Sequence, residues 1–204
     1  MAFWHDLVTQ KSFAILQDLK KRHNFILIGG WAVFLYTHAL KSKDIDMILD
    51  YAELENFKRQ YDLIKNDRLK KYEAKVGEID IDIYVPHFSN PGMPAEEIAG
   101  YTTSREGFKV PIPEVLLILK ERAYLERQNS IKGEKDRIDI ISILQTGELD
   151  LKLYWEVLKK YKMEEFKEQL LALLKSVREV PELNLDEQKY SKLKKGVLAE
   201  LSAD

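Results

Sequence analysis

Hydrophobic and polar residues follow two different periods in the first half of the chain. Apolar residues at helical spacing indicate amphipathic helices, and period-two alternation or short apolar runs indicate strands. The run before Gly29-Gly30 predicts a buried strand that enters a tight turn. The predicted helices are about residues 5–22, Trp31–Leu40 and Tyr51–Ile64, and the predicted strands are Phe25–Ile28, Lys43–Leu49, Glu78–Val85 and a short pair within Tyr101–Val110.

The second half of the chain has almost entirely helical spacing. Pro113 stands at a favourable first-turn position for a long helix, and four more helices are expected at Lys135–Leu144, Leu151–Tyr161, Glu164–Arg178 and Asp186–Leu201. Strands therefore concentrate before residue 112 and helices follow. This segregation predicts an α/β (α+β) fold, in which residues 1–112 form a mixed-sheet core flanked by helices and residues 113–204 form a helical region packed on it.

Composition restricts the classes of function. Of the 204 residues, 45% are hydrophobic and 32% are charged, and the formal net charge is −2. The molecule as a whole is therefore no general polyanion binder, and nucleic acid would need a local basic patch. Cysteine is absent, which excludes disulfides and thiolate metal sites. We find neither a signal peptide nor a membrane-length apolar run, and we expect a cytoplasmic protein.

A glycine turn and acidic residues on neighbouring strands carry the candidate chemistry. Gly29 and Gly30 let the backbone approach a phosphate, and the helix behind them offers free N–H groups to that anion. Asp44 and Asp46 are two positions apart, so both carboxylates are expected on one face of a strand. Two such carboxylates suit Mg²⁺ or Mn²⁺ shared with substrate phosphates. A third, from Glu78–Val85, would complete a two-metal site and accept a proton.

These motifs and their order resemble the DNA polymerase β-like nucleotidyltransferase superfamily. GGWAVFLYTHALKSKDIDMIL resembles its glycine-helix-aspartate signature, although many members have serine where Gly30 stands. EIDIDIYV resembles its third acidic strand, and by analogy Asp82 is the preferred third carboxylate, with Asp80 as the alternative. The resemblance implies a nucleotidyltransferase-like fold and ATP or another nucleoside triphosphate as substrate. It also implies Mg²⁺-dependent transfer of a nucleoside monophosphate to an acceptor hydroxyl.

Within that superfamily the chain is most similar to the AbiEii-type toxins of type IV toxin–antitoxin systems. PIPEVLLILKERAYLER resembles their proline-glutamate-leucine helix and places Lys120 near the nucleotide. KGEKDRIDIISIL resembles their lysine-aspartate helix and places Lys135, Asp136 and Asp139 on nucleotide-binding positions. The resemblance covers about residues 24–145. It implies a tRNA or protein acceptor and a cognate antitoxin as partner.

Each motif also has a plainer interpretation. The glycines also suit an ordinary strand-to-helix turn, and the aspartates a solvated strand face. Lys120 also suits a snorkelling surface lysine, and Asp136 and Asp139 suit ordinary helix ion pairs. Two other functions fit the same pattern: a small-molecule nucleotidyltransferase of the antibiotic-modifying type, and a non-catalytic nucleotide-binding module.

Overall fold

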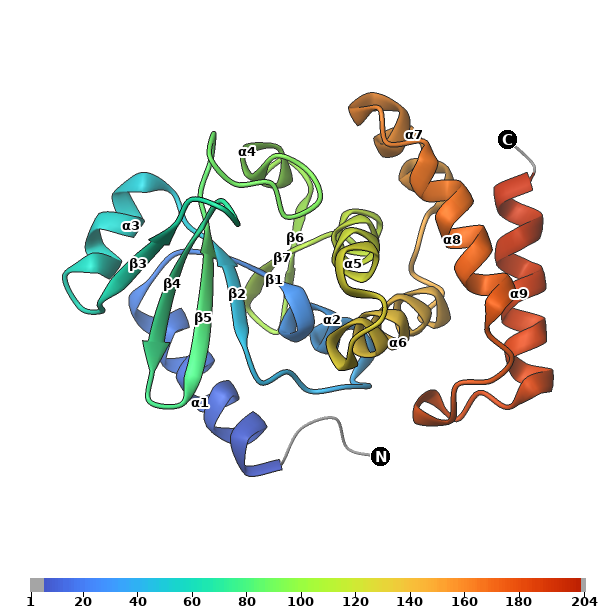
Figure 1. Cartoon of the computed structure of the whole chain (residues 1–204), viewed down its shortest axis with the longest axis horizontal. Helices are drawn as coiled ribbons and strands as arrows, with labels where there is room; N and C mark the ends of the chain where they lie inside the picture. Colours follow the sequence, from blue (N-terminus) through green and yellow to red (C-terminus); the bar gives the residue numbers. More distant parts are fainter. Residues whose placement is uncertain (1–5, 203–204) are drawn as a thin grey trace. The chain divides into compact units, whose positions relative to one another are not determined.

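A computed structural model describes residues 6–202 of the chain. It divides into two compact units, Ala2–Ile112 and Pro113–Asp204 (Figure 1). The first unit contains all the strands named below, and the second is helical. That the helical region packs on the core stays a prediction. None of the helices between residues 6 and 202 combines the length and the hydropathy that crossing a membrane requires.

The first unit is built on a seven-stranded mixed sheet. Its strand order is β3-β4-β5-β2-β1-β7-β6 (Figure 1). The β2–β5 and β1–β7 pairs are parallel, whereas the other neighbouring pairs are antiparallel. The strands are β1 (Ile26–Ile28), β2 (Ile45–Ile48), β3 (Leu63–Asn66), β4 (Lys71–Val76), β5 (Ile79–Tyr84), β6 (Thr102–Arg105) and β7 (Phe108–Pro111).

Alternation along the central strands separates an apolar face from an acidic one. Leu27 of β1 is the register partner of Met47 of β2, which in turn pairs with Ile83 of β5. All three side chains are fully buried. The neighbouring row along the same strands contains Asp46 and Asp82, so successive residues point to opposite faces. Burial of the apolar row thereby fixes the face on which the acidic residues lie.

Four helices complete the first unit: α1 (Asp6–Arg22), α2 (Gly29–Thr37), α3 (Tyr51–Lys58) and α4 (Ala95–Ile98). Helix α1 packs against β5, and α2 packs against β1 and β2. The indole Nε1 of Trp31 donates to Ser12 Oγ at 2.9 Å, which joins α1 to α2 inside the core. Helix α3 is preceded by Asp50, whose carboxylate accepts from the Glu53 amide at 2.7 Å as an N-cap.

Within residues 113–202, the second unit contains five α-helices and a short 3₁₀ turn. Helices α5 and α6 pack closely against each other. Ser130 caps α6 by accepting from the Gly133 amide at 3.0 Å, and Asp150 caps α7 in the same way. The elements are α5 (Pro113–Arg127), α6 (Ile131–Gln145), α7 (Leu151–Tyr161), α8 (Glu165–Ser176), the 3₁₀ turn η1 (Pro181–Leu183) and α9 (Glu187–Ser202).

The predicted fold class, a mixed sheet flanked by helices and followed by a helical region, is confirmed. One element was predicted wrongly. The helix expected over Tyr51–Ile64 ends at Lys58, and Ile64 lies in β3. The β3–β4 hairpin was not predicted, because β3 lacks an apolar–polar alternation, and β4 alternates but buries only one residue, Ala74.

Candidate active site

The glycine turn joins β1 directly to α2. Gly29 has φ +67°, a left-handed conformation that favours glycine. A Cβ atom on Gly29 would lie 2.8 Å from Asp46 Cβ and closer still to the Asp46 carboxylate. The first position of α2 is preceded by Ile28, whose side chain makes no capping hydrogen bond. The Asp46 side chain therefore lies against the glycine backbone at the helix N-terminus.

Two of the predicted carboxylates are direct neighbours across the sheet. Asp46 of β2 is the register partner of Asp82 of β5, and on its other side it pairs with Ile28 of β1. Register partners carry their side chains on one face, so Asp46 lies next to the glycine turn and Asp82 lies beside Asp46, one strand further from the turn. Asp44 precedes β2 in a bend rather than within the strand. It is near enough for its charge to act on Asp82.

The electrostatics of Asp82 reflect this crowding. Burial raises the pKa of Asp82 above its ordinary value, Lys71 partly opposes that rise, and the charges of Glu73 and Asp44 add to it. Lys71 Nζ lies 2.6 Å from Asp82 Oδ2. Burial, and to a smaller extent the like charges on this face, thus disfavour the ionised carboxylate, which is the condition a bound cation relieves.

Asp80, the alternative third carboxylate, lies two residues earlier on the same face of β5. Its register partner is Lys75 of β4, with Lys75 Nζ 3.2 Å from Asp80 Oδ1. The Asp80 side chain is 50% exposed, whereas that of Asp82 is 24% exposed. The sheet register therefore brings Asp82, and not Asp80, next to Asp46.

The three aspartates at this site are of the ligand type that a divalent cation binds. Asp44, Asp46 and Asp82 offer carboxylate oxygens, the ligands that Mg²⁺ and Mn²⁺ take. The space over Gly29, which a Cβ would fill, is where the Asp46 carboxylate lies. Within residues 6–202, however, no three acidic, histidine or cysteine side chains are arranged as a ready metal cluster. The Asp82 carboxylate also has a cationic neighbour, because Lys71 Nζ lies 2.6 Å from its Oδ2.

The predicted nucleotide-binding residues of the second unit come together with one another. Lys120 Nζ lies 3.1 Å from Asp136 Oδ1 and 2.7 Å from Asp139 Oδ2. Lys135 Nζ lies 2.9 Å from Asp139 Oδ2, and Arg127 forms two hydrogen bonds to Asp136. Each of the lysine and aspartate side chains is at most 7% exposed. They form a buried ionic cluster between α5 and α6.

Oppositely charged side chains in this cluster shift one another's pKa values. Burial by itself would raise the pKa of Asp136, but Lys120 and Arg127 outweigh it and hold the pKa below its ordinary value. Burial lowers the pKa of Lys135, and Asp139 opposes that change. The plainer interpretation of Lys120 as an exposed, snorkelling lysine is wrong, because its side chain is 7% exposed.

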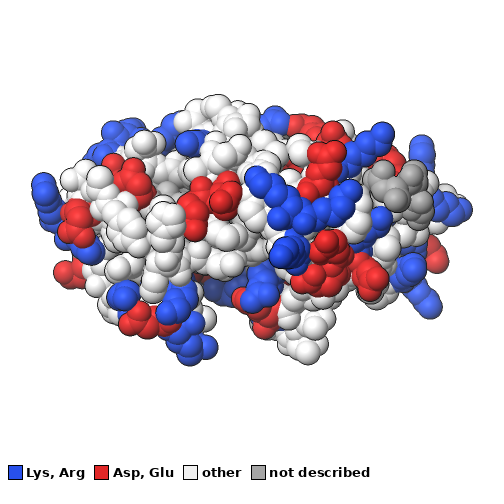
Figure 2. Space-filling view, turned by 90° about the horizontal axis from the view of Figure 1, so that it is seen from above, with Lys and Arg blue, Asp and Glu red and all other residues white. Residues whose placement is uncertain are grey.

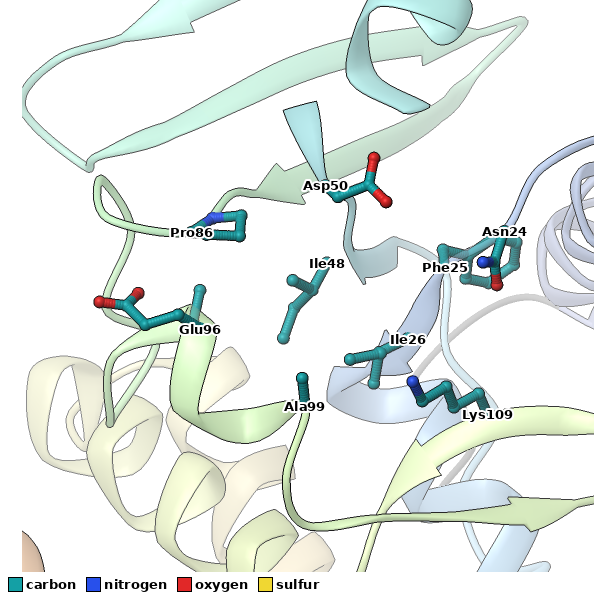
Figure 3. A pocket seen from close by; sticks show the side chains of 10 residues that line it. Asn24, Phe25, Ile26, Ile48, Asp50, Pro86, Glu96, Ala99 and Lys109 are labelled. Atoms are coloured by element: carbon teal, nitrogen blue, oxygen red, sulfur yellow. The ribbon is translucent and has the colours of Figure 1, made fainter. Parts of the chain in front are cut away.

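A pocket of about 240 Å³ lies in the first unit, away from the glycine turn (Figure 3). Ile26 and Ile48 form its floor, and they are the register pair at the end of β1 and β2 opposite to Gly29 and Asp46. Figure 3 shows Lys109 on one side of the pocket and Glu96 on the other. This pocket is separate from the carboxylate site, and none of the residues predicted for the site lines it.

Sequence reasoning missed the β4 residues that contact Asp82. Glu73 is the register partner of Asp82 because β4 pairs antiparallel with β5, and Lys71, two residues earlier on β4, reaches Asp82 with its Nζ at 2.6 Å. Both contacts require the unpredicted hairpin. The period-two spacing of Lys71, Glu73 and Lys75 was the available signal. This signal was missed because β4 is short and buries only Ala74, so its apolar positions do not form a clear hydrophobic face.

The site combines two features: carboxylates from adjacent strands, and next to them a glycine turn at which a helix begins. No family model matches the sequence, and no curated protein matches it. The chain is similar to an antigenic nucleotidyltransferase-like protein from Paracoccidioides brasiliensis, with a TM-score of 0.43, 19% identity, and coverage of 68% of this chain and 75% of that one. It is also similar to the Megavirus polyadenylate synthase, with a TM-score of 0.45, 16% identity, and coverage of 71% of this chain and 32% of that one.

Proposed function

We propose that the chain is a metal-dependent nucleotidyltransferase of the DNA polymerase β-like superfamily. The observation that carries this proposal is the contact of Asp46 with Gly29 together with the Asp46–Asp82 register pair. A helix N-terminus that could accept a phosphate and acidic residues that could bind a cation thus lie close together at the central strands of the sheet. The motif order in the sequence supports the same assignment.

Each part of the site has a role in the proposed reaction. Gly29 and Gly30 would receive the triphosphate at the N-terminus of α2, and Asp44 and Asp46 would hold a divalent cation. That cation, when bound, would supply positive charge to the phosphates. The acceptor hydroxyl oxygen forms a bond to the α-phosphorus while the bond from that phosphorus to pyrophosphate breaks.

Asp82 would take the proton of the acceptor hydroxyl. Burial, with the charges of Glu73 and Asp44, raises the pKa of Asp82 even though Lys71 opposes the rise. A carboxylate with a raised pKa is a stronger base than an ordinary one. Its position beside Asp46 places this base on the face that would hold the triphosphate.

The proposal includes a nucleotide contact by Lys120, Lys135, Asp136 and Asp139, which rests on the motif resemblance alone. Their mutual ion pairs support a structural contribution to the α5–α6 pair. A toxin role of the AbiEii type, with a cognate antitoxin, likewise rests on the resemblance of these motifs.

We propose RNA as the acceptor because basic residues concentrate at the β3–β4 hairpin. Residues 58–71 contain six basic and two acidic residues in a chain with a net charge of −2. Lys65 Nζ and Lys70 Nζ lie 4.8 and 5.2 Å from the ring centre of Phe88, which gives the basic segment an aromatic neighbour. The face drawn in Figure 2 instead carries both signs of charge interspersed.

Transfer of labelled nucleotide tests the proposal. Purified protein with Mg²⁺ and α-labelled triphosphates is expected to label total RNA and to release pyrophosphate. Asp46→Asn should lower the rate by at least about 100-fold, because it removes a cation ligand. Asp80→Asn, the matched exposed aspartate of β5, should change the rate by no more than about twofold. Absence of transfer to RNA, protein and small acceptors alike, or an active Asp46→Asn variant, would contradict the proposal.

A further inference from the structure

Lys71 is bound between two acidic side chains on the face of the sheet that carries the candidate site. Its Nζ lies 2.6 Å from Asp82 Oδ2 and 3.1 Å from Glu73 Oε1. Asn66 Nδ2 donates to the same Glu73 oxygen at 3.0 Å. The Lys71 side chain is 12% exposed, so its ammonium group is held in place rather than sampling solvent.

The side chain of Lys71 reaches the acidic row from two residues away along β4. Asp82 stands between Asp46 of β2 and Glu73 of β4, so it has a carboxylate neighbour on each side. The ammonium of Lys71 contacts one oxygen of Asp82 directly. A positive charge at this distance reduces the attraction of that carboxylate for a second cation. Mg²⁺ also gives up its water reluctantly, so it competes poorly for an oxygen that is already bonded.

We infer that Lys71 is a positioning residue that acts as a built-in cation at the third carboxylate. The nucleotide-free site then takes one divalent ion, at Asp44 and Asp46, in place of the two ions that the three carboxylates would suit without the Lys71 charge. Lys71 holds Asp82 beside Asp46 and keeps it from recruiting the second ion. This inference rests on the proposed function, because it assumes that Asp44 and Asp46 bind a cation.

Three substitutions separate the charge of Lys71 from its bulk. Lys71→Met keeps most of the side-chain length and removes the charge, whereas Lys71→Arg keeps the charge. Asp82→Asn removes the carboxylate on which the lysine acts. The Lys71→Met/Asp82→Asn double variant completes a cycle in which the charge effect should vanish. Circular dichroism of each full-length variant verifies that it is folded.

Calorimetric titration of the full chain with Mn²⁺, without nucleotide, measures the stoichiometry. We expect one ion for the wild type and for Lys71→Arg. Lys71→Met should take a second ion, with an affinity at least about tenfold above any second binding to the wild type. Asp82→Asn and the double variant should each take one ion.

The outcomes distinguish this inference from the proposed function. Two ions on the wild type, or a Lys71→Met variant that titrates like the wild type, would overturn the role of Lys71. If Asp46→Asn still removes bound Mn²⁺ in either case, the metal site of the proposed function stands. If Asp46→Asn leaves Mn²⁺ binding unchanged, the metal site itself is wrong and the inference falls with it.

Discussion

Gly29 is required by two separate physical conditions. Its φ of +67° disfavours any residue with a Cβ, and such a Cβ would collide with the Asp46 side chain. Gly77 has a similar φ of +60°, but a Cβ there would meet no atom within 4 Å. The two positions therefore share the backbone strain and differ in the collision, which makes them a matched pair.

Gly29→Ala should destabilise the protein more than Gly77→Ala. Backbone strain alone costs about 1–2 kcal/mol at either position. The collision adds to this cost at Gly29 and displaces the Asp46 carboxylate, so Mn²⁺ affinity should fall only in Gly29→Ala. Urea unfolding and Mn²⁺ titration measure the two effects. Equal losses of stability with unchanged Mn²⁺ binding in both variants would show that Asp46 does not depend on the glycine.

Glu121 predicts a pH dependence of stability in the second unit. Its buried carboxyl accepts from the Tyr154 hydroxyl at 3.0 and 3.1 Å. Burial raises the pKa of Glu121 well above its ordinary value, and the Tyr154 hydrogen bond only partly opposes this. The folded state therefore binds the proton more tightly than the unfolded state. The stabilising contribution is complete below the unfolded pKa of about 4.3 and is lost as the pH rises through the folded pKa.

Glu121→Gln should remove this dependence, because glutamine stays neutral and still accepts from Tyr154. Relative to the wild type, the variant should gain stability as the pH rises above the unfolded pKa, and the gain should level off once the folded pKa of Glu121 is passed. Urea unfolding across that range measures the difference. Tyr154→Phe serves as the control, since it removes the hydrogen bond and leaves the ionisable group. Stability curves that run parallel for the wild type and Glu121→Gln would refute the assignment.

At the residue scale, the sequence predicted the residue types of the site better than their contacts. The period-two spacing of Asp80 and Asp82 correctly indicated acids on a strand face, whereas Asp44 lies in a bend before β2. The choice between Asp80 and Asp82 as the neighbour of Asp46 depends on the β2–β5 register, which spacing within one strand does not contain. Lys71 could not be connected to Asp82 without knowledge of the antiparallel β4–β5 pairing.

At the scale of elements, the α5–α6 pair depends on a buried ionic cluster. Asp139 is contacted by both Lys120 and Lys135, and its side chain is 1% exposed. Asp139→Ala would leave two buried ammonium groups without this partner. We expect a loss of about 3–5 kcal/mol in the free energy of unfolding, which is typical of a broken buried pair.

An exposed ion pair on the same helix provides the comparison. Arg122 and Glu126 of α5 form an i,i+4 pair with side chains 51% and 60% exposed. Glu126→Ala should change stability by no more than about 0.5 kcal/mol, because solvent screens such pairs. Urea unfolding of both variants tests this contrast. Similar losses in the two variants would contradict a structural role for the buried cluster.

Helices and central strands were predictable because their faces are buried, and the β3–β4 hairpin was not. Strand β5 alternates fully buried isoleucines with partly exposed residues, a pattern that the sequence displays directly. Strand β3 has no buried residue, and β4 has one, Ala74. These strands form because β5 supplies a hydrogen-bonding edge, so their structure depends on partners distant in sequence.

At the scale of the whole molecule, the proposed RNA acceptor is expected to bind at the basic residues of the β3–β4 hairpin. Replacing Lys65, Arg68 and Lys70 with alanine should weaken binding to single-stranded RNA. The slope of log K against log salt should also fall by about 0.7 for each RNA phosphate that the variant no longer neutralises. Replacing Lys192, Lys194 and Lys195 of α9 removes the same charge from the other unit and should leave the slope unchanged. Equal effects of the two triple variants would mean that only overall charge matters.

Paramagnetic broadening by Mn²⁺ tests the central claim most directly. In the full-length, ¹⁵N-labelled protein, substoichiometric Mn²⁺ should first broaden the amide signals of Gly29, Gly30, Asp46 and Asp82. Asp46→Asn should abolish that broadening. Broadening that begins elsewhere in the chain, or that is the same in Asp46→Asn, would contradict a cation site built from these carboxylates beside the glycine turn.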